Sequence, residues 1–345
     1  MISVVIPAYN AEVTLGRCLA ALGEQTRPPD EIILVDDGST DGTAELARRH
    51  GVQVISQTNA GPGAARNTGA RAARGDLLLF TDADCAPAPE WVERMAAPFA
   101  DPAVAGAKGV YGTTQGELVA RFVQIEYEDK YDRMRGQPRI DFVDTYSAGY
   151  RRDVFLQAGG FDTTFPTASV EDQEFSFRLA KAGHRLVFVP DASVLHLHDR
   201  TLAEYVRRKY WIGYWKALVT QRYPSKLARD SHTPQVLKLQ MGMAGAGALC
   251  LVLSFLLRLG DLGRTQAAPR RGRRAGWARW GLLFWLTHGL TTLPFVRKAW
   301  PKDREVALLS PLLLFARAWA LGVGFVLGNL RWLKRVDTPG KKTGS

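Results

Sequence analysis

Short apolar runs alternate with stretches of helical periodicity along the N-terminal part of the chain. Four runs rich in Val, Ile and Leu have the length of buried strands, namely ISVVI (2–6), EIILVD (31–36), VQVIS (52–56) and DLLLF (76–80). The intervening stretches predict helices, of which the first follows Asn10 as a cap and the third lies between Pro62 and Gly75. This alternation predicts an α/β fold, a parallel sheet with helices on both faces.

Each of these strands ends in polar or turn-forming residues. In order along the chain they are Ala8-Tyr9-Asn10, Asp36-Asp37-Gly38-Ser39, Gln57-Thr58-Asn59 and Asp82-Ala83-Asp84. The carboxyl ends of parallel strands meet at one edge of a sheet, and ligands of such sheets bind outside that edge. We therefore expect a binding site built from these four turns.

Between residues 104 and 200 the pattern is less regular. We expect a helix near 115–135, a glycine-marked loop SAGYRRDVFLQAGGFD, a helix in VEDQEFSFRLAKAG, and two short strands, RLVFV and ASVLHLH. The chain then divides into a globular part, 1–200 (with halves 1–103 and 104–200), a basic and aromatic amphipathic helix within 201–235, a hydrophobic part, 236–335, and a basic tail, 336–345.

Three segments of the hydrophobic part carry few charges, namely 239–257, 280–296 and 306–330. A membrane span needs about 20 apolar residues. Buried helices of a soluble domain are the alternative, but the basic residues after each segment and the tryptophans near their ends favour membrane association. Because the links between the segments are basic, we expect a hairpin of the last two with a re-entrant first segment, or helices that lie in the interface. Arg317 within the third segment is expected to face an anionic group or to snorkel.

Composition narrows the functional classes. The chain has 345 residues, 46% of them apolar, and a net charge of +11, which fits an anionic membrane surface, phosphorylated substrates or nucleic acid. Its three cysteines are scattered, so we expect neither a disulfide framework nor a zinc site, and a reducing compartment. We expect no signal peptide, since the first strand begins at residue 2.

Asp82 and Asp84 are the residues most suggestive of chemistry. They follow a buried strand, and side chains at positions i and i+2 of a strand share a face. Two adjacent carboxylates repel each other unless a proton or a cation lies between them. Mg²⁺ or Mn²⁺ suits this arrangement, because such ions bind one or two carboxylates together with substrate phosphates. An acidic turn that caps the next helix is the alternative.

Two neighbouring motifs extend this site. VDDGSTDGT (35–43) brings Asp36 and Asp37, which can accept hydrogen bonds from a base or a ribose, and NAGPGAARNTG (59–69) brings Arg66, which can pair with phosphate oxygens. A helix cap and a surface arginine are the alternatives. Neither G-x-x-x-x-G-K-[ST] nor a G-x-G-x-x-G after the first strand is present, which argues against a P-loop enzyme and a dinucleotide oxidoreductase.

The order of the motifs VVIPAYN, VDDGSTDGT, AGPGAARNTGA, LLLFTDADC, AGGFD and VEDQEFSFRLAKAG resembles that of family 2 glycosyltransferases over residues 1–200. The resemblance implies a GT-A fold, with a mixed, mostly parallel sheet, and inverting transfer of a sugar from a nucleotide-diphosphate donor with Mg²⁺ or Mn²⁺. It divides residues 1–200 into a nucleotide-sugar-binding half and an acceptor-side half.

The resemblance also implies roles for particular residues. Asp36 or Asp37 contacts the nucleoside and Arg66 lies nearby, while Asp82, Ala83 and Asp84 form the D-x-D motif, in which Asp84 is the more direct metal ligand. Glu171 and Asp172 supply the base, which we expect to be Asp172, since inverting transfer needs a carboxylate to take the acceptor's proton. The nucleoside pocket is lined by Pro7, Ala8 and Tyr9, and His196, with His198 beside it on the same strand face, is a further candidate for the metal or the diphosphate.

We expect a donor such as a UDP- or GDP-sugar, a lipid-linked or other saccharide acceptor of cell-envelope or exopolysaccharide synthesis, a catalytic domain on the cytoplasmic face of a membrane, and no nucleic acid partner. The basic and aromatic helix RTLAEYVRRKYWIGYWKALVTQRYP suits a membrane interface. A clear Q-x-x-R-W signature is missing, so single transfers are favoured over polymerisation. The alternatives are a nucleotidyltransferase that makes nucleotide sugars and a non-catalytic membrane scaffold.

Overall fold

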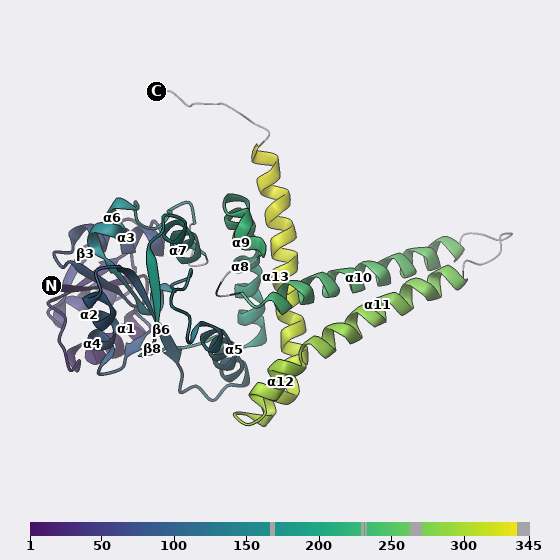
Figure 1. Ribbon diagram of the computed structural model, residues 1–345, viewed down its shortest axis with the longest axis horizontal. Coiled ribbons are helices and arrows are strands. Elements are labelled where there is room, and N and C mark those ends of the chain that lie inside the picture. Colours follow the sequence, from purple (N-terminus) through teal and green to yellow (C-terminus); the bar gives the residue numbers. More distant parts are fainter. Residues whose placement is uncertain (166–169, 229–230, 232, 263–270, 337–345) are drawn as a thin grey trace. The chain divides into compact units, whose positions relative to one another are not determined.

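The computed structural model describes residues 1–165, 170–228, 231, 233–262 and 271–336 (Figure 1). The chain forms two compact units, the first from Met1–Asp199 with Val219–His232 and the second from Arg200–Leu218 with Thr233–Ser345. The sequence placed the boundary at residue 200 and a linking helix within 201–235. In the structure that stretch is divided between the units, because helix α8 (Leu202–Arg222) runs from one into the other.

A mixed, mostly parallel sheet of eight strands forms the centre of the first unit, as expected. Its spatial order is β3-β2-β1-β4-β7-β6-β8-β5. Strands β1 to β4 run parallel to one another and correspond to the four predicted strands, whereas β7 is antiparallel to both of its neighbours, β4 and β6. The strands are β1 (Ile2–Ala8), β2 (Glu31–Asp36), β3 (Gln53–Ser56), β4 (Leu77–Phe80), β5 (Ala86–Pro87), β6 (Val104–Gly112), β7 (Ala148–Arg151) and β8 (Arg185–Leu195).

Helices cover both faces of this sheet, because the strand residues alternate between two apolar clusters. Val4 and Ile6 pack with one cluster, which includes residues of helices α1 and α4, and Val5 packs with the other, which includes residues of α3, α6 and α7. The helices of the first unit are α1 (Glu12–Gly23), α2 (Thr43–Arg49), α3 (Pro62–Ala72), α4 (Trp91–Ala96), α5 (Leu118–Met134), α6 (Arg152–Gln157), α7 (Glu171–Lys181) and α9 (Pro224–Ala228).

Two local predictions are wrong. Asn10 does not cap α1, since it has a φ of 49° and its side-chain oxygen accepts hydrogen bonds from Thr40 instead. The two strands expected between residues 185 and 198 are a single strand, β8, whose pairing with β6 shifts register between Lys108 and Val110. The irregular pairing explains the error, because it breaks the alternation without ending the strand.

The second unit consists of helices. They are the first part of α8, then α10 (Gln235–Leu262), α11 (Arg271–Thr291), α12 (Leu293–Ala299) and α13 (Arg304–Val336). Among the described residues, two helical stretches are long and apolar enough to cross a membrane, Gln235–Leu259 and Arg304–Arg331. The predicted segment 280–296 is not continuous, because α11 ends at Thr291 and α12 begins with Leu293 and Pro294.

Close helix packing organises the second unit. Helices α10 and α11 lie side by side (Figure 1), and α12 packs against α13. In α13, Gly324 and Gly328 are spaced as in a G-x-x-x-G motif, and a Cβ on either would collide with the backbone of α8 at Tyr210 or Tyr214. This part of the basic and aromatic helix therefore packs against protein.

Candidate active site

The D-x-D motif lies in a turn and not at the end of a strand. Strand β4 ends at Phe80, and the N–H of Cys85 donates to the carbonyl of Asp82 at 3.0 Å. The expectation that Asp82 and Asp84 share a face rested on an extended backbone, so it fails here. Each carboxylate instead has its own cationic or titratable partner, and this separation relieves their repulsion.

Arg66 is the partner of Asp82. Its guanidinium Nη2 donates to Asp82 Oδ1 at 2.6 Å, and its Nη1 donates to Glu171 Oε1 at 3.1 Å. The side chains of Arg66 and Glu171 are each 3% exposed. Burial disfavours the charge of Arg66, but the two carboxylates outweigh it and raise its pKa. Arg66 thus joins the D-x-D motif to the first turn of α7, which carries the candidate base.

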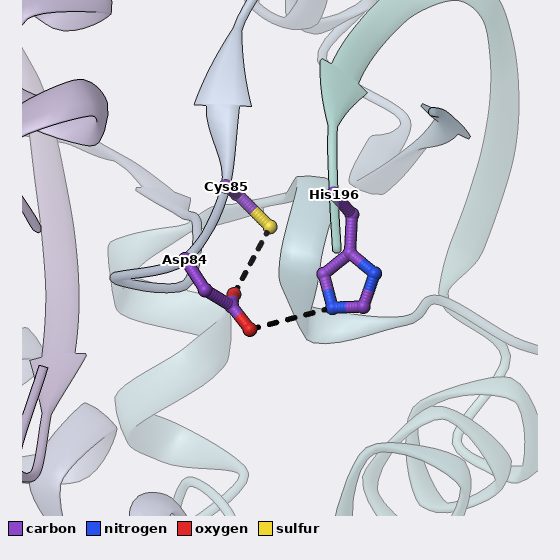
Figure 2. Close-up of side chains that lie close together, drawn as sticks. All are labelled: Asp84, Cys85 and His196. Atoms are coloured by element: carbon purple, nitrogen blue, oxygen red, sulfur yellow. Dashed lines mark hydrogen bonds and ion pairs between the residues drawn. The ribbon is translucent and has the colours of Figure 1, made fainter. Parts of the chain in front are cut away.

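Asp84 faces His196. Asp84 Oδ2 lies 3.5 Å from His196 Nε2, and the side chain of Asp84 is 41% exposed (Figure 2). Burial raises the pKa of Asp84, but the hydrogen bond and charge of His196 outweigh it and hold that pKa below its ordinary value. One carboxylate oxygen and one imidazole nitrogen suit Mn²⁺ or Mg²⁺, and the open side leaves coordination positions for phosphate oxygens and water. The donor set therefore fits a divalent cation.

Pairing of two short strand segments brings Asp84 and His196 together. Strand β5 begins at Ala86, directly after the D-x-D turn, and pairs antiparallel with β8, so that Ala86 lies opposite Leu195. His196 follows β8, and its N–H donates to the carbonyl of Gly112 at 2.9 Å. This pairing fixes the ends of both turns at one place on the sheet.

Cys85 is a residue that the sequence analysis missed. Its sulfur lies with the Asp84 oxygen and the His196 nitrogen in one group whose atoms are within 4.8 Å of one another (Figure 2). The thiol is buried, and burial together with the charges of Asp84 and Asp82 raises its pKa well above the ordinary value. It therefore stays protonated and donates to Asp84 Oδ1 at 3.6 Å. We assign it to orienting Asp84 and not to binding a cation as thiolate.

Asp36 and Asp37 differ in what they contact. Both oxygens of Asp37 accept hydrogen bonds from the loop before α3, from Gln57 Nε2 at 2.7 Å, Ala60 N at 2.9 Å and Gly61 N at 2.9 Å. Asp36 accepts through Oδ1 from Ser39 N at 3.0 Å. Asp37 thus holds the loop in place, and Asp36 is the better placed of the two for a ligand.

Three further predicted residues lie at the carboxyl end of the first strand. Pro7 and Ala8 are buried within β1, next to β2, where Ala8 pairs with Asp36, and Tyr9 is 54% exposed. The structure therefore brings these residues beside Asp36, as the parallel sheet predicts. Ala83 is buried between the two aspartates of the D-x-D turn.

Asp172 stands in the first turn of α7, next to Glu171. It is partly exposed, and its Oδ1 accepts from the N–H of Gln173 at 2.7 Å. Desolvation and the charge of Glu171 raise its pKa to about 7, against the opposing charge of Arg66. A carboxylate with such a pKa can accept a proton near neutral pH.

Lys108 is a second residue that the sequence analysis missed. It lies on β6, is fully buried, forms an ion pair with Asp144 and donates to Tyr146 Oη at 3.2 Å. Burial lowers its pKa and the charge of Asp172 opposes the shift. We take the lysine to be charged, since the Asp144 carboxylate contacts it directly. Its position inside a strand of small residues, VAGAKGVYG, is the signal that could have found it.

A glycine loop anchors the region before α7 to α3. The side-chain amide of Asn67 donates to the carbonyl of Phe161 at 2.8 Å and accepts from the N–H of Phe161 at 2.8 Å. Gly160 has a φ of 67°, and a Cβ there would lie 2.4 Å from Asn67 Oδ1. Only glycine permits this approach, so the AGGFD motif serves to hold the two halves of the site together.

Comparisons with known proteins support a glycosyltransferase with the GT-A fold. Residues 3–158 match the sequence profile described as Glycosyl transferase family 2. Similar curated proteins include a "Pre-mycofactocin glycosyltransferase" of Mycobacterium tuberculosis, 28% identical over 97% of this chain and 72% of the relative, and "Glycosyltransferase AglE" of Haloferax volcanii, 29% identical over 61% of this chain and 71% of the relative. Among solved structures, a mannosyltransferase from Pyrobaculum calidifontis in complex with GDP-Man and Mn²⁺ shares the fold, with a TM-score of 0.56 and 18% identity over 95% of this chain and 86% of that one.

Proposed function

Since residues 3–158 are a family 2 glycosyltransferase domain with the GT-A fold, and the chain is therefore a transferase, we propose that it moves a sugar with inversion from a nucleotide-diphosphate donor to an acceptor hydroxyl. The observation that carries this proposal is the Arg66 bridge. It connects the D-x-D turn, where a diphosphate would be held, to Glu171, the neighbour of Asp172. A leaving-group site and a base are the two parts that such a displacement needs.

Asp172 takes the proton of the acceptor hydroxyl. The hydroxyl oxygen attacks the anomeric carbon of the donor sugar, and the bond between that carbon and the diphosphate breaks. Asp84 and His196 would hold Mg²⁺ or Mn²⁺, which neutralises charge on the leaving diphosphate. Arg66 holds Asp82 in place through the hydrogen bond from its Nη2 to Asp82 Oδ1. Lys108 limits how far the pKa of Asp172 rises.

For the donor we propose a UDP- or GDP-sugar. Asp36 would accept hydrogen bonds from the nucleoside, with Pro7, Ala8 and Tyr9 beside it. The mannosyltransferase of the same fold was solved with GDP-Man and Mn²⁺, which supports a nucleotide diphosphate and a divalent cation. The similar curated proteins act on different targets by name, among them an "O-antigen chain rhamnosyltransferase".

We further propose that the acceptor is a lipid-linked saccharide or another saccharide, and that the enzyme works on the cytoplasmic face of a membrane. Two apolar helical stretches of the second unit support membrane association. The basic surplus of the chain, +11, supports contact with an anionic cytoplasmic leaflet.

Replacing Asp84 by asparagine is expected to abolish Mn²⁺-dependent binding of the donor nucleotide. Asparagine removes the charge that a divalent cation requires and keeps the shape of the side chain. Calorimetric titration of UDP and GDP, with and without Mn²⁺, into detergent-solubilised protein measures this. Asp191→Asn, an exposed acid on β8, is the control and should leave binding unchanged. If Asp84→Asn bound the donor nucleotide with wild-type affinity in the presence of Mn²⁺, Asp84 would not be a metal ligand.

Deleting residues 236–345 is expected to release the protein from membranes, because both apolar stretches begin at or after residue 235. Flotation of the full-length and truncated proteins with liposomes that contain anionic lipids measures this. If the truncated protein still floats with the liposomes, the anchor lies before residue 236, and α8 takes that role.

A further inference from the structure

His198 lies behind His196 and contacts it through a ring nitrogen. His196 Nδ1 and His198 Nδ1 are 3.1 Å apart, and His198 Nε2 lies 3.0 Å from the side-chain oxygen of Gln124 on α5. His198 is 3% exposed. Three polar side chains thus form a line that ends at the nitrogen facing Asp84.

The surroundings of Gln124 fix the direction of these hydrogen bonds. Its side-chain nitrogen donates to the carbonyl of Tyr111 at 3.1 Å and to Glu128 Oε1 at 3.2 Å. Both partners are acceptors, so a flipped amide would set oxygen against oxygen. The amide oxygen of Gln124 therefore faces His198, and His198 Nε2 must carry a proton to donate to it.

This proton decides the tautomer of His196. In the neutral pair, His198 with its proton on Nε2 has a bare Nδ1, which can only accept. His196 must then carry its proton on Nδ1, because the other tautomer would place two bare nitrogens 3.1 Å apart. In the neutral ring His196 Nε2 carries the lone pair, and this nitrogen faces Asp84 Oδ2 (Figure 2). When no metal is bound, a proton on Nε2 can donate to Asp84, and a cation would take the place of that proton.

We propose that His198 and Gln124 are positioning residues that hold His196 as a metal ligand with its Nε2 lone pair directed at the site. This inference rests on the proposed metal site at Asp84 and His196. Ring packing supports the orientation of the His198 ring. It stacks on Tyr127, with ring centroids 5.7 Å apart and an interplanar angle of 12°, and it meets Tyr111 edge-on, with centroids 5.4 Å apart and an angle of 87°. Hydrogen bonds to the far nitrogen of a ligating histidine typically govern its tautomer and its affinity for the metal.

Two substitutions of His198 separate positioning from packing. His198→Phe keeps a ring between Tyr111 and Tyr127 but has no acceptor for His196 Nδ1–H. His198→Asn loses the ring but can place its amide oxygen near the position of Nδ1. We expect His198→Phe to weaken Mn²⁺ binding by about 10- to 100-fold and His198→Asn to stay close to wild type. A role in packing alone gives the reverse order.

The measurement is a titration of Mn²⁺, alone and with excess UDP or GDP, into the full-length protein in detergent, followed by the EPR signal of free Mn²⁺. Equal affinity of His198→Phe and wild type overturns the inference. Absence of Mn²⁺ binding to the wild type under all three conditions overturns the proposed metal site itself. The ¹⁵N shifts of histidine-labelled, metal-free protein test the tautomer independently, and a bare Nδ1 on His196 contradicts the inference whatever the metal result.

Discussion

Asp172→Asn is expected to lower kcat for sugar transfer by about 10²- to 10⁴-fold while the affinity for the donor nucleotide is unchanged. The amide cannot accept the proton of the acceptor hydroxyl, and Asp172 makes no hydrogen bond to the D-x-D turn in the described residues. Initial rates with saturating donor, together with calorimetric binding of UDP and GDP, check both parts. Turnover close to wild type would assign the base to another residue.

The pH dependence of the rate gives the same residue a second test. Because its pKa is raised to about 7, the ionised base is a minority below neutral pH. The rate of the wild type should therefore rise about tenfold per pH unit below pH 7 and level off above it. The residual rate of Asp172→Asn should not show this rise with pH. The same rise in the variant would mean that another group titrates.

The contribution of Asp172 to folding stability should fall as pH rises, whereas the rate of transfer should increase. The folded protein holds the proton of Asp172 up to a pH of about 7, whereas the unfolded chain releases it near the ordinary pKa of about 4. The folded state therefore binds more protons over this window, and the contribution of Asp172 to stability falls as pH rises through it. Asp172→Asn should raise Tm relative to wild type at pH 8 and leave the difference small at pH 4, as thermal unfolding at both pH values can show.

Arg66→Met is expected to cost about 3–5 kcal/mol of stability, the usual result of removing one partner of a buried ion pair. Glu171, 3% exposed, would lose the hydrogen bond from Arg66 Nη1, and Asp82 would lose its ion pair with Arg66 Nη2 as well. Denaturant unfolding gives the free energy directly. Arg71→Met, at an exposed position of the same helix, is the matched control and should cost little.

A double variant identifies the cause of that loss. Arg66→Met combined with Glu171→Gln also removes the buried carboxylate charge that has lost its ion pair with Arg66, so the double variant should be more stable than Arg66→Met alone. If the destabilisation by Glu171→Gln alone adds in full to that by Arg66→Met, the two residues are not coupled, and the bridge does not stabilise the site. Transfer activity should remain low in both variants, because the D-x-D turn has lost its connection to α7.

The resemblance to family 2 glycosyltransferases and the parallel order of β1 to β4 both follow from the sequence. Their signals are local, since four apolar runs with polar residues after each strand, such as Asp36 and Asp82, need only the geometry of a parallel sheet to meet at one edge. The separation of the D-x-D carboxylates did not follow. From the sequence we expected residues 82–84 to continue the extended backbone of β4, whereas β4 ends at Phe80 and the D-x-D motif lies in a turn.

Only the tertiary structure decided which partner each carboxylate has. Arg66 joins Asp82 to Glu171, β5 pairs with β8 and brings Asp84 to His196, and Asp37 holds the loop before α3 while Asp36 accepts from Ser39. These contacts connect residues far apart in the chain. Periodicity and motif spacing report only on neighbours a few residues away, so they determine the elements and their chemistry, and packing of the finished sheet determines the pairs.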